Sequence, residues 1–171
     1  MSGDASAWST RPETASDVAA IRAVTLAAFD TAAEADLVDV LRSDPAWLDG
    51  LSFVATAPDG SVVGHALLTR CWIGEVPALC LAPCSVLPDH QGQGVGSRVI
   101  EAVLAAARER GEDFVVVLGH PTYYPRFGFR RASAAGIRLS VEVPDEALMA
   151  KALTTRPLPS GQVRYAEPFG I

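Results

Sequence analysis

Residues 88 to 97 read Pro88-Asp89-His90-Gln91-Gly92-Gln93-Gly94-Val95-Gly96-Ser97, with a glycine at every second position from 92 to 96. An apolar run that ends at Leu87 precedes this stretch, and apolar residues at helical spacing follow it from Val95. Glycines let successive amide groups point into one concavity, and a following helix adds unpaired N–H groups and the positive end of its dipole. The stretch therefore predicts a strand, a loop and a helix that together bind a diphosphate.

Two common phosphate-binding motifs do not match this loop. A Walker loop needs Gly-Lys followed by Ser or Thr, and the chain has no such sequence. The dinucleotide fingerprint G-x-G-x-x-G is also missed, because Gly92, Gly94 and Gly96 give G-x-G-x-G. A tight turn between strand and helix is the alternative that assigns the glycines no ligand.

Patterns on both sides of the loop predict a chain of alternating elements. Pro58 to Ser61 is a turn sequence between two β-rich runs and predicts a hairpin. Pro83 cannot donate a ladder hydrogen bond, so a bulge or a splayed edge is expected there. The expected elements are an extended start at Trp8–Arg11, helices at Ala15–Phe29 and Ala32–Arg42, strands at Leu51–Ala57, Val62–Arg70 and Ala78–Leu87, a helix from Val95 that Gly111 closes, and a strand at Phe114–Leu118.

Both early helices begin with the residue types of a capping box, Thr14 with Asp17 and Thr31 with Glu34. The whole chain has 171 residues, of which 49% are hydrophobic and 20% charged. This length and composition indicate one globular α/β domain over residues 1–171. Residues from about 139 to 171 are expected to form a C-terminal extension packed on it.

A second signature, Tyr124-Pro125-Arg126-Phe127-Gly128-Phe129, lies about 30 residues after the glycine loop. Together, Gln91-Gly92-Gln93-Gly94-Val95-Gly96 and this Y-x-x-x-G-F sequence resemble the GNAT N-acetyltransferases, whose loop pattern is [QR]-x-x-G-x-[GA]. The longer run from Leu118 to Phe129 looks like the YhbS-like branch of that family. The resemblance covers about Trp8 to Ile137, and the tail from Leu139 resembles the branch more loosely.

The resemblance implies a mixed, mostly antiparallel sheet with helices on both faces. It also implies acetyl-CoA as cosubstrate, in a gap between Cys84–Leu87 and Val115–Gly119 where the strands splay. Backbone groups of Ser85 and Val86 would then bind the pantetheine arm, and one N–H would polarise the thioester carbonyl. The expected cofactor-binding residues are Cys84, Ser85, Val86, Leu87, Gln91, Gly92, Gln93, Gly94, Val95, Gly96 and Ser97.

By the same resemblance, Tyr124 is the general acid that assists departure of the thiolate, and an aromatic wedge is its alternative role. An amine with a pKa near 10.4 is protonated at pH 7, and deprotonating it costs about 4.6 kcal/mol, so a base is required. Two candidates are His120, which follows the strand beside the gap, and Glu34, since the branch has an acidic residue in its second helix. His65 is expected to be structural. Cys84 has no basic neighbour in sequence, which argues against an acyl-enzyme.

The remaining composition limits partners and compartment. The net charge of −6 and the absence of a basic run argue against nucleic acid and anionic membranes as partners. Three cysteines without a C-x-x-C pair argue for reduced thiols and against structural zinc, and no secretory signal is apparent, so a cytoplasmic location is expected. The family implies a small-molecule or peptide amine as acceptor and suggests a homodimer.

The expected activity is transfer of the acetyl group to a primary amine by direct attack in a ternary complex, without a metal. Two other functions stay open at this stage. A non-catalytic acyl-CoA-binding or regulatory module would keep the loop without acceptor chemistry, and a nucleotide-binding oxidoreductase would bind NAD(H) instead of CoA.

Overall fold

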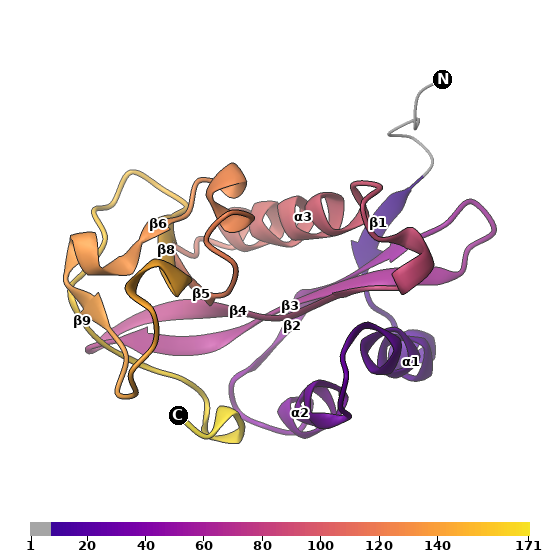
Figure 1. Ribbon diagram of the computed structural model, residues 1–171, viewed down its shortest axis with the longest axis horizontal. Coiled ribbons are helices and arrows are strands. Elements are labelled where there is room, and N and C mark those ends of the chain that lie inside the picture. The colour runs from indigo at the N-terminus through magenta and orange to yellow at the C-terminus, as the bar shows by residue number, and fades with distance from the viewer. Residues whose placement is uncertain (1–7) are drawn as a thin grey trace.

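The computed structural model describes residues 8–171. A twisted sheet forms its centre, with the long helix on one face and two shorter helices on the other (Figure 1). The helices are α1 (Val18–Ala28), α2 (Ala33–Leu41) and α3 (Val95–Glu109). The strands are β1 (Ser9–Pro12), β2 (Trp47–Thr56), β3 (Val62–Ile73), β4 (Val76–Val86), β5 (Phe114–Leu118), β6 (Arg130–Arg131), β7 (Ile137–Arg138), β8 (Leu148–Ala152) and β9 (Gly161–Arg164).

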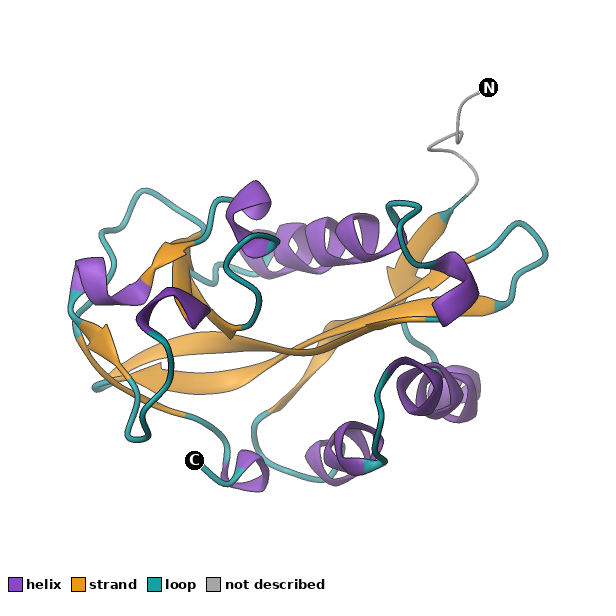
Figure 2. Ribbon diagram, in the orientation of Figure 1, coloured by secondary structure: helices purple, strands orange, loops and turns teal. Residues whose placement is uncertain are grey.

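The order of strands across the sheet is β1-β2-β3-β4-β5-β8-β6, and β9 pairs with both β3 and β7. Along this path β4 and β5 are parallel, whereas the other neighbours are antiparallel. Figure 2 shows the long central strands between α3 on one side and α1 and α2 on the other. The mixed, mostly antiparallel α/β fold expected from the sequence is therefore confirmed. The segment after residue 139 contributes β8 and β9 to it.

Alternating side chains of the central strands create separate cores on the two faces. Ala66 and Leu68 of β3 pack with the apolar stripe of α3, including Val99 and Val103. Leu67, between them in sequence, packs on the opposite face with residues of α1 and α2. This period of two places His65, like Leu67, on the α1 side. The residues of β3 thus decide which side chains reach each face.

The hairpin and the bulge are confirmed. Thr56 pairs with Val62 across the turn, where Gly60 has a φ of 88°. Between the pairs Ala66–Cys84 and Leu68–Leu81, β3 advances two residues while β4 advances three. The extra residue is the expected bulge at Pro83, and it bends β4 just before the segment that borders the gap.

The two capping predictions differ in outcome. The Thr14 N–H donates to Asp17 Oδ2 at 2.7 Å, in a short turn that leads into α1, so the first capping box is confirmed. The second is wrong. Ala32 is already in the αR conformation and is the residue before α2, so Thr31 lies one position too early. Its hydroxyl accepts from the Ala33 N–H at 3.3 Å and donates to Glu34 Oε1 at 3.4 Å instead.

Candidate active site

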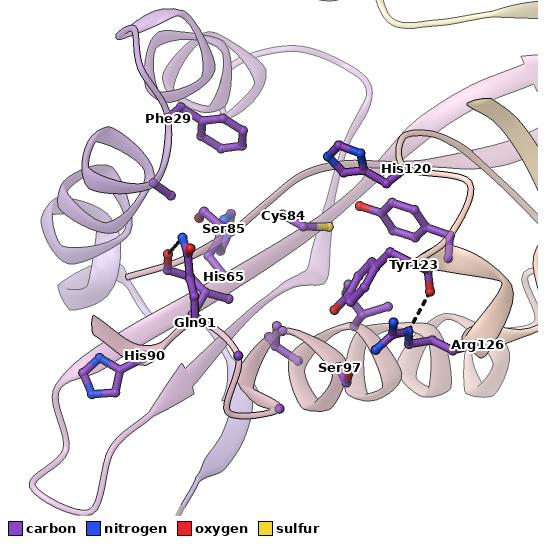
Figure 3. A pocket seen from close by; sticks show the side chains of 18 residues that line it. Phe29, His65, Cys84, Ser85, His90, Gln91, Ser97, His120, Tyr123 and Arg126 are labelled. Carbon is purple, nitrogen blue, oxygen red and sulfur yellow. Dashed lines mark hydrogen bonds between the residues drawn. The ribbon is translucent and has the colours of Figure 1, made fainter. Parts of the chain in front are cut away.

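A cavity of about 520 Å³ lies where the end of α1, the last residues of β4, the start of α3 and the loop after β5 meet (Figure 3). Side chains from segments far apart in sequence form its wall. The lining residues are Ala28, Phe29, His65, Cys84, Ser85, Val86, His90, Gln91, Gly92, Gly94, Gly96, Ser97, Val99, Ile100, His120, Tyr123, Tyr124 and Arg126.

The gap between β4 and β5 leaves backbone groups at the end of β4 without a partner on β5. The two strands pair only at Leu79–Val115 and Cys80–Val116, and they diverge beyond these positions. The Leu87 N–H donates to the Val63 carbonyl of β3 at 2.9 Å. Because backbone direction alternates along an antiparallel ladder, Val86 directs its backbone groups away from β3, and Ser85 directs its groups toward β3. Of the two residues expected to offer backbone to a pantetheine arm, Val86 therefore faces the gap.

The glycine loop adopts a conformation that few other residues tolerate. Gly92 and Gly94 have φ values of 76° and 87°, and Gly94 is the N-cap of α3. A Cβ on either glycine would meet no protein atom within 4 Å, so their open side is available to a ligand. The side chain of Gln91 supports the loop by donating to the Val86 carbonyl at 3.1 Å. The loop and the first N–H groups of α3 thus fit a diphosphate.

The second signature forms a short turn that positions Tyr124 beside the gap. Residues Tyr124–Phe127 make this turn, and Gly128 closes it at a φ of 92°. A Cβ on Gly119 would lie 2.5 Å from the Tyr124 ring, so a glycine at the end of β5 is required for the ring to pack there. Tyr124 also packs edge-on against Phe129. The glycine and phenylalanine of the Y-x-x-x-G-F pattern therefore hold the Tyr124 ring in place.

The polar tip of Tyr124 lies next to the Cys84 thiol. Burial, followed by the nearby thiol, raises the pKa of Tyr124. Burial also raises the pKa of Cys84 to about 12. Both groups therefore keep their protons at neutral pH, which makes Tyr124 a proton donor and Cys84 a poor nucleophile.

The two base candidates lie in different places. His120 lines the cavity, where its ring and that of Phe29 approach from opposite sides (Figure 3). Glu34, at the start of α2, is absent from the described lining and contacts Thr31 instead. Among the described residues there is no group of three or more His, Cys, Asp or Glu side chains that could hold a metal ion. No helix in residues 8–171 is long and apolar enough to cross a membrane.

Sequence reasoning missed some of the wall. Phe29 leaves α1 in an extended conformation, although periodicity had placed it inside the helix. Arg126 lies over the Tyr123 ring at 4.4 Å and donates to the Tyr123 carbonyl at 2.8 Å. The sequence signals for these residues were only the place of Arg126 within the second signature and the place of Phe29 at a helix end.

A parallel strand pair that opens beside a glycine loop, with a tyrosine at its edge, defines an acyl-CoA-dependent transferase domain. The model of the Acetyltransferase (GNAT) family matches residues 19–129, and the chain belongs to this family. It is 40% identical over 162 residues to the N-acetyltransferase YjhQ of Escherichia coli K12, covering 90% of this chain and 89% of YjhQ. It is 31% identical over 169 residues to the N-acetyltransferase YhbS of the same strain, covering 93% and 96% of the two chains.

Solved structures agree with this assignment. YhbS from Escherichia coli in complex with CoA superposes with a TM-score of 0.89 at 28% identity, covering 96% of this chain and 92% of that one. A GNAT acetyltransferase from Brucella melitensis in complex with acetyl-CoA gives 0.78 at 34% identity, covering 95% and 97%. The chain is thus a GNAT N-acetyltransferase that uses acetyl-CoA, and the relatives favour the enzyme over a non-catalytic module.

Proposed function

We propose that the protein transfers the acetyl group of acetyl-CoA to a primary amine by direct attack within a ternary complex. The observation that carries this proposal is the position of Tyr124, whose protonated hydroxyl lies beside Cys84 where the gap opens. Cys84 itself has a raised thiol pKa, which argues against a route through an acyl-enzyme. Attack by the amine on the thioester therefore needs no covalent enzyme intermediate.

Residues of β4 and of the glycine loop would hold the cosubstrate. The amides of Gln91, Gly92, Gln93, Gly94, Val95, Gly96 and Ser97 would bind the diphosphate, and the segment Cys84–Leu87 would hold the pantetheine arm. Val86 is the best placed of these residues, because its backbone points into the gap. An N–H from this strand would stabilise negative charge on the thioester oxygen during attack.

Tyr124 would act as the general acid. A free tyrosine has a pKa near 10 and a thiol a pKa near 8.5, and burial raises the tyrosine further. The hydroxyl would therefore stabilise the departing thiolate mainly through a strong hydrogen bond, because complete transfer of its proton to the thiolate is uphill.

His120 would take the first proton from the acceptor ammonium, because it lines the cavity and is exposed to solvent. Glu34 is the weaker candidate, because it interacts with Thr31 rather than with the cavity. GNAT acetyltransferases act on small-molecule or peptide acceptors, and we propose an acceptor of this kind. Three free thiols, at Cys71, Cys80 and Cys84, support a reducing compartment such as the cytoplasm.

The test is release of CoA thiol from acetyl-CoA in the presence of a panel of primary amines, combined with calorimetric binding of CoA. Amine-dependent thiol release and an acetylated product by mass spectrometry are the expected results. CoA binding without turnover by any amine in the panel would instead support a non-catalytic acyl-CoA-binding module.

A further inference from the structure

Three side chains form a buried polar chain beneath α1. The Ser52 hydroxyl, on β2, donates to Glu13 Oε1 and lies 2.8 Å from Nε2 of His65 on β3. Glu13 Oε2 also pairs with Arg42, and this pair is largely shielded from solvent. Ser52 and His65 are fully or almost fully buried. These hydrogen-bonded side chains therefore run from an ion pair near the surface to the centre of the sheet.

The donors and acceptors along this chain fix the tautomer of His65. The Glu13 carboxylate only accepts hydrogen bonds, so the hydrogen of Ser52 points toward it. The Ser52 oxygen can then only accept from His65, which places the imidazole hydrogen on Nε2. Nδ1 keeps its lone pair, and it is a buried atom without a hydrogen-bond partner. Such an atom is costly to bury, so its presence in the cavity wall requires an explanation.

Ser85 connects this lone pair to the cavity. His65 and Ser85 are paired residues on β3 and β4, so their side chains are neighbours on the same face (Figure 3). The Ser85 hydroxyl contacts Thr25 Oγ1 at 3.4 Å, a long hydrogen bond. Thr25 uses its own hydrogen on the Ile21 carbonyl at 2.8 Å, so Ser85 is the donor in that contact. A rotation of the Ser85 side chain and its hydroxyl would direct this hydrogen toward His65 Nδ1, which has no other hydrogen-bond partner.

Amide formation from an ammonium group requires the loss of two protons from nitrogen. The first is lost before attack, which makes the amine a nucleophile. The second is lost after the N–C bond forms, when the nitrogen of the tetrahedral intermediate carries a positive charge. That nitrogen is more acidic than the free ammonium, because its new neighbour carbon bears oxygen and sulfur. A weak base inside the protein can therefore accept the second proton.

We propose that Ser85, His65, Ser52 and Glu13 form a proton relay that removes this second proton. The inference rests on the proposed acetyl transfer. The nitrogen of the intermediate gives its proton to the Ser85 oxygen, and the Ser85 hydrogen passes to His65 Nδ1. The Nε2 hydrogen of His65 moves to Ser52, and the Ser52 hydrogen moves to Glu13. Meanwhile the C–S bond breaks, and the Tyr124 hydroxyl stabilises the departing thiolate with a hydrogen bond. Ser85 is the member that touches substrate, and the other three act through it.

The low pKa of His65 agrees with a residue that passes a proton on without becoming an imidazolium. Burial, and then the charge of Arg42, lower the pKa of His65 to about 3. An imidazolium is therefore unfavourable, whereas passage through two neutral tautomers leaves the ring uncharged. Among the four residues of the relay, Glu13 is the one with a negative charge, and it is paired with Arg42.

Ser52→Val and Ser52→Thr form the matched test, because the two side chains have the same shape and only threonine keeps a hydroxyl. The expected result is a kcat lowered about tenfold or more by Ser52→Val, with the KM of acetyl-CoA and of the amine within about twofold, and a kcat restored to within about threefold by Ser52→Thr. Equal kcat values for the two variants, whether both lowered or both unchanged, would overturn the relay. Wild-type thiol release is the separate test of the proposed function.

The tautomer gives a second test that does not depend on turnover. In the uniformly ¹⁵N-labelled full chain, the imidazole spectrum of wild-type protein is expected to show His65 protonated at Nε2 and unprotonated at Nδ1 at pH 7. A hydrogen on Nδ1 would overturn the proposed direction of transfer, even if the Ser52 variants fold poorly.

Discussion

The hydroxyl of Tyr124 and the thiol of Cys84 lie next to each other, and each affects the ionisation of the other. Cys84 belongs to the end of β4, and Tyr124 belongs to the turn after β5. These two segments are the sides of the gap in the sheet. The sulfur of a bound thioester would therefore enter a site that already accommodates a thiol beside a phenol.

Replacing Tyr124 with phenylalanine removes this hydroxyl and keeps the ring. We expect CoA affinity within a few-fold of wild type and a kcat lowered by about 10² or less, the low end for general acid catalysis. Steady-state kinetics under conditions where chemistry is rate-limiting, with calorimetry for CoA, would measure both effects. An unchanged kcat would leave Tyr124 with a packing role only.

Gly94 and Gly60 offer a matched pair for the diphosphate loop. The φ angle is 87° at Gly94 and 88° at Gly60, and a Cβ on either would meet no protein atom within 4 Å. Alanine at either position therefore carries a similar strain of about 1 kcal/mol. We expect Gly94→Ala to weaken CoA binding about tenfold or more, Gly94→Val to abolish it, and Gly60→Ala to leave it unchanged. Similar CoA affinities for the two alanine variants would argue against the loop as the diphosphate site.

His120→Gln and Glu34→Gln separate the two base candidates. A histidine base gives kcat/KM an acidic limb, and glutamine can hydrogen-bond but cannot titrate. We expect His120→Gln to lose that limb and to lower kcat while CoA binding is retained. Glu34→Gln is expected to keep the profile, with a stability loss of about 0.5 kcal/mol at most. Loss of the limb in Glu34→Gln alone would reverse the assignment.

The buried His65 predicts a dependence of stability on pH. Its pKa is lowered to about 3 in the folded protein, and an unfolded histidine has a pKa near 6.5. The unfolded state therefore binds the extra proton first, so this stability is complete above about pH 6.5 and is lost as the pH falls toward 3. The free energy of unfolding should decrease by about 1.4 kcal/mol per pH unit below 6.

Urea unfolding of wild type and His65→Gln at pH 7, 6 and 5 would measure this difference. The expected result is that the difference in free energy of unfolding between wild type and His65→Gln becomes smaller as the pH falls. A difference that does not change with pH would contradict a neutral, buried imidazole. Asp17 does not interfere in this range, because Arg11 lowers its pKa and its effect begins below about pH 4.

Local residue types made much of the fold and the cofactor loop predictable. Gly92 and Gly94 adopt a left-handed backbone, which glycine reaches more readily than other residues, and Gly60 does so in the hairpin turn. Pro83 marked the bulge in β4 because a missing N–H cannot be compensated within a ladder. In each case the conformation depends on the residue itself rather than on a distant partner.

Features set by distant contacts could not be predicted. Glu13 and Ser52 are 39 residues apart, and Ser52 and His65 are 13 apart, so no local pattern joins them. The antiparallel pairing of β8 with β5 was hidden for another reason. The five residues of β8, which include Lys151, are too few to show a period. Their pairing with β5 depends on backbone groups that come together only in the folded protein. The start of α2 was misjudged because Thr31 and Ala32 both could precede the helix.

Because β4 and β5 pair at only two positions, the stability of the sheet depends on whether a ligand occupies the gap. A molecule that spans the gap would contact β4 on one side and β5 or the following turn on the other, and so join parts that the backbone alone leaves separate. Its binding energy would then add to the resistance of the whole domain to unfolding, by about 2.7 kcal/mol at a free concentration of 100 Kd. In a cell, the pool of CoA and acetyl-CoA would therefore influence how long each copy of this chain survives proteolysis.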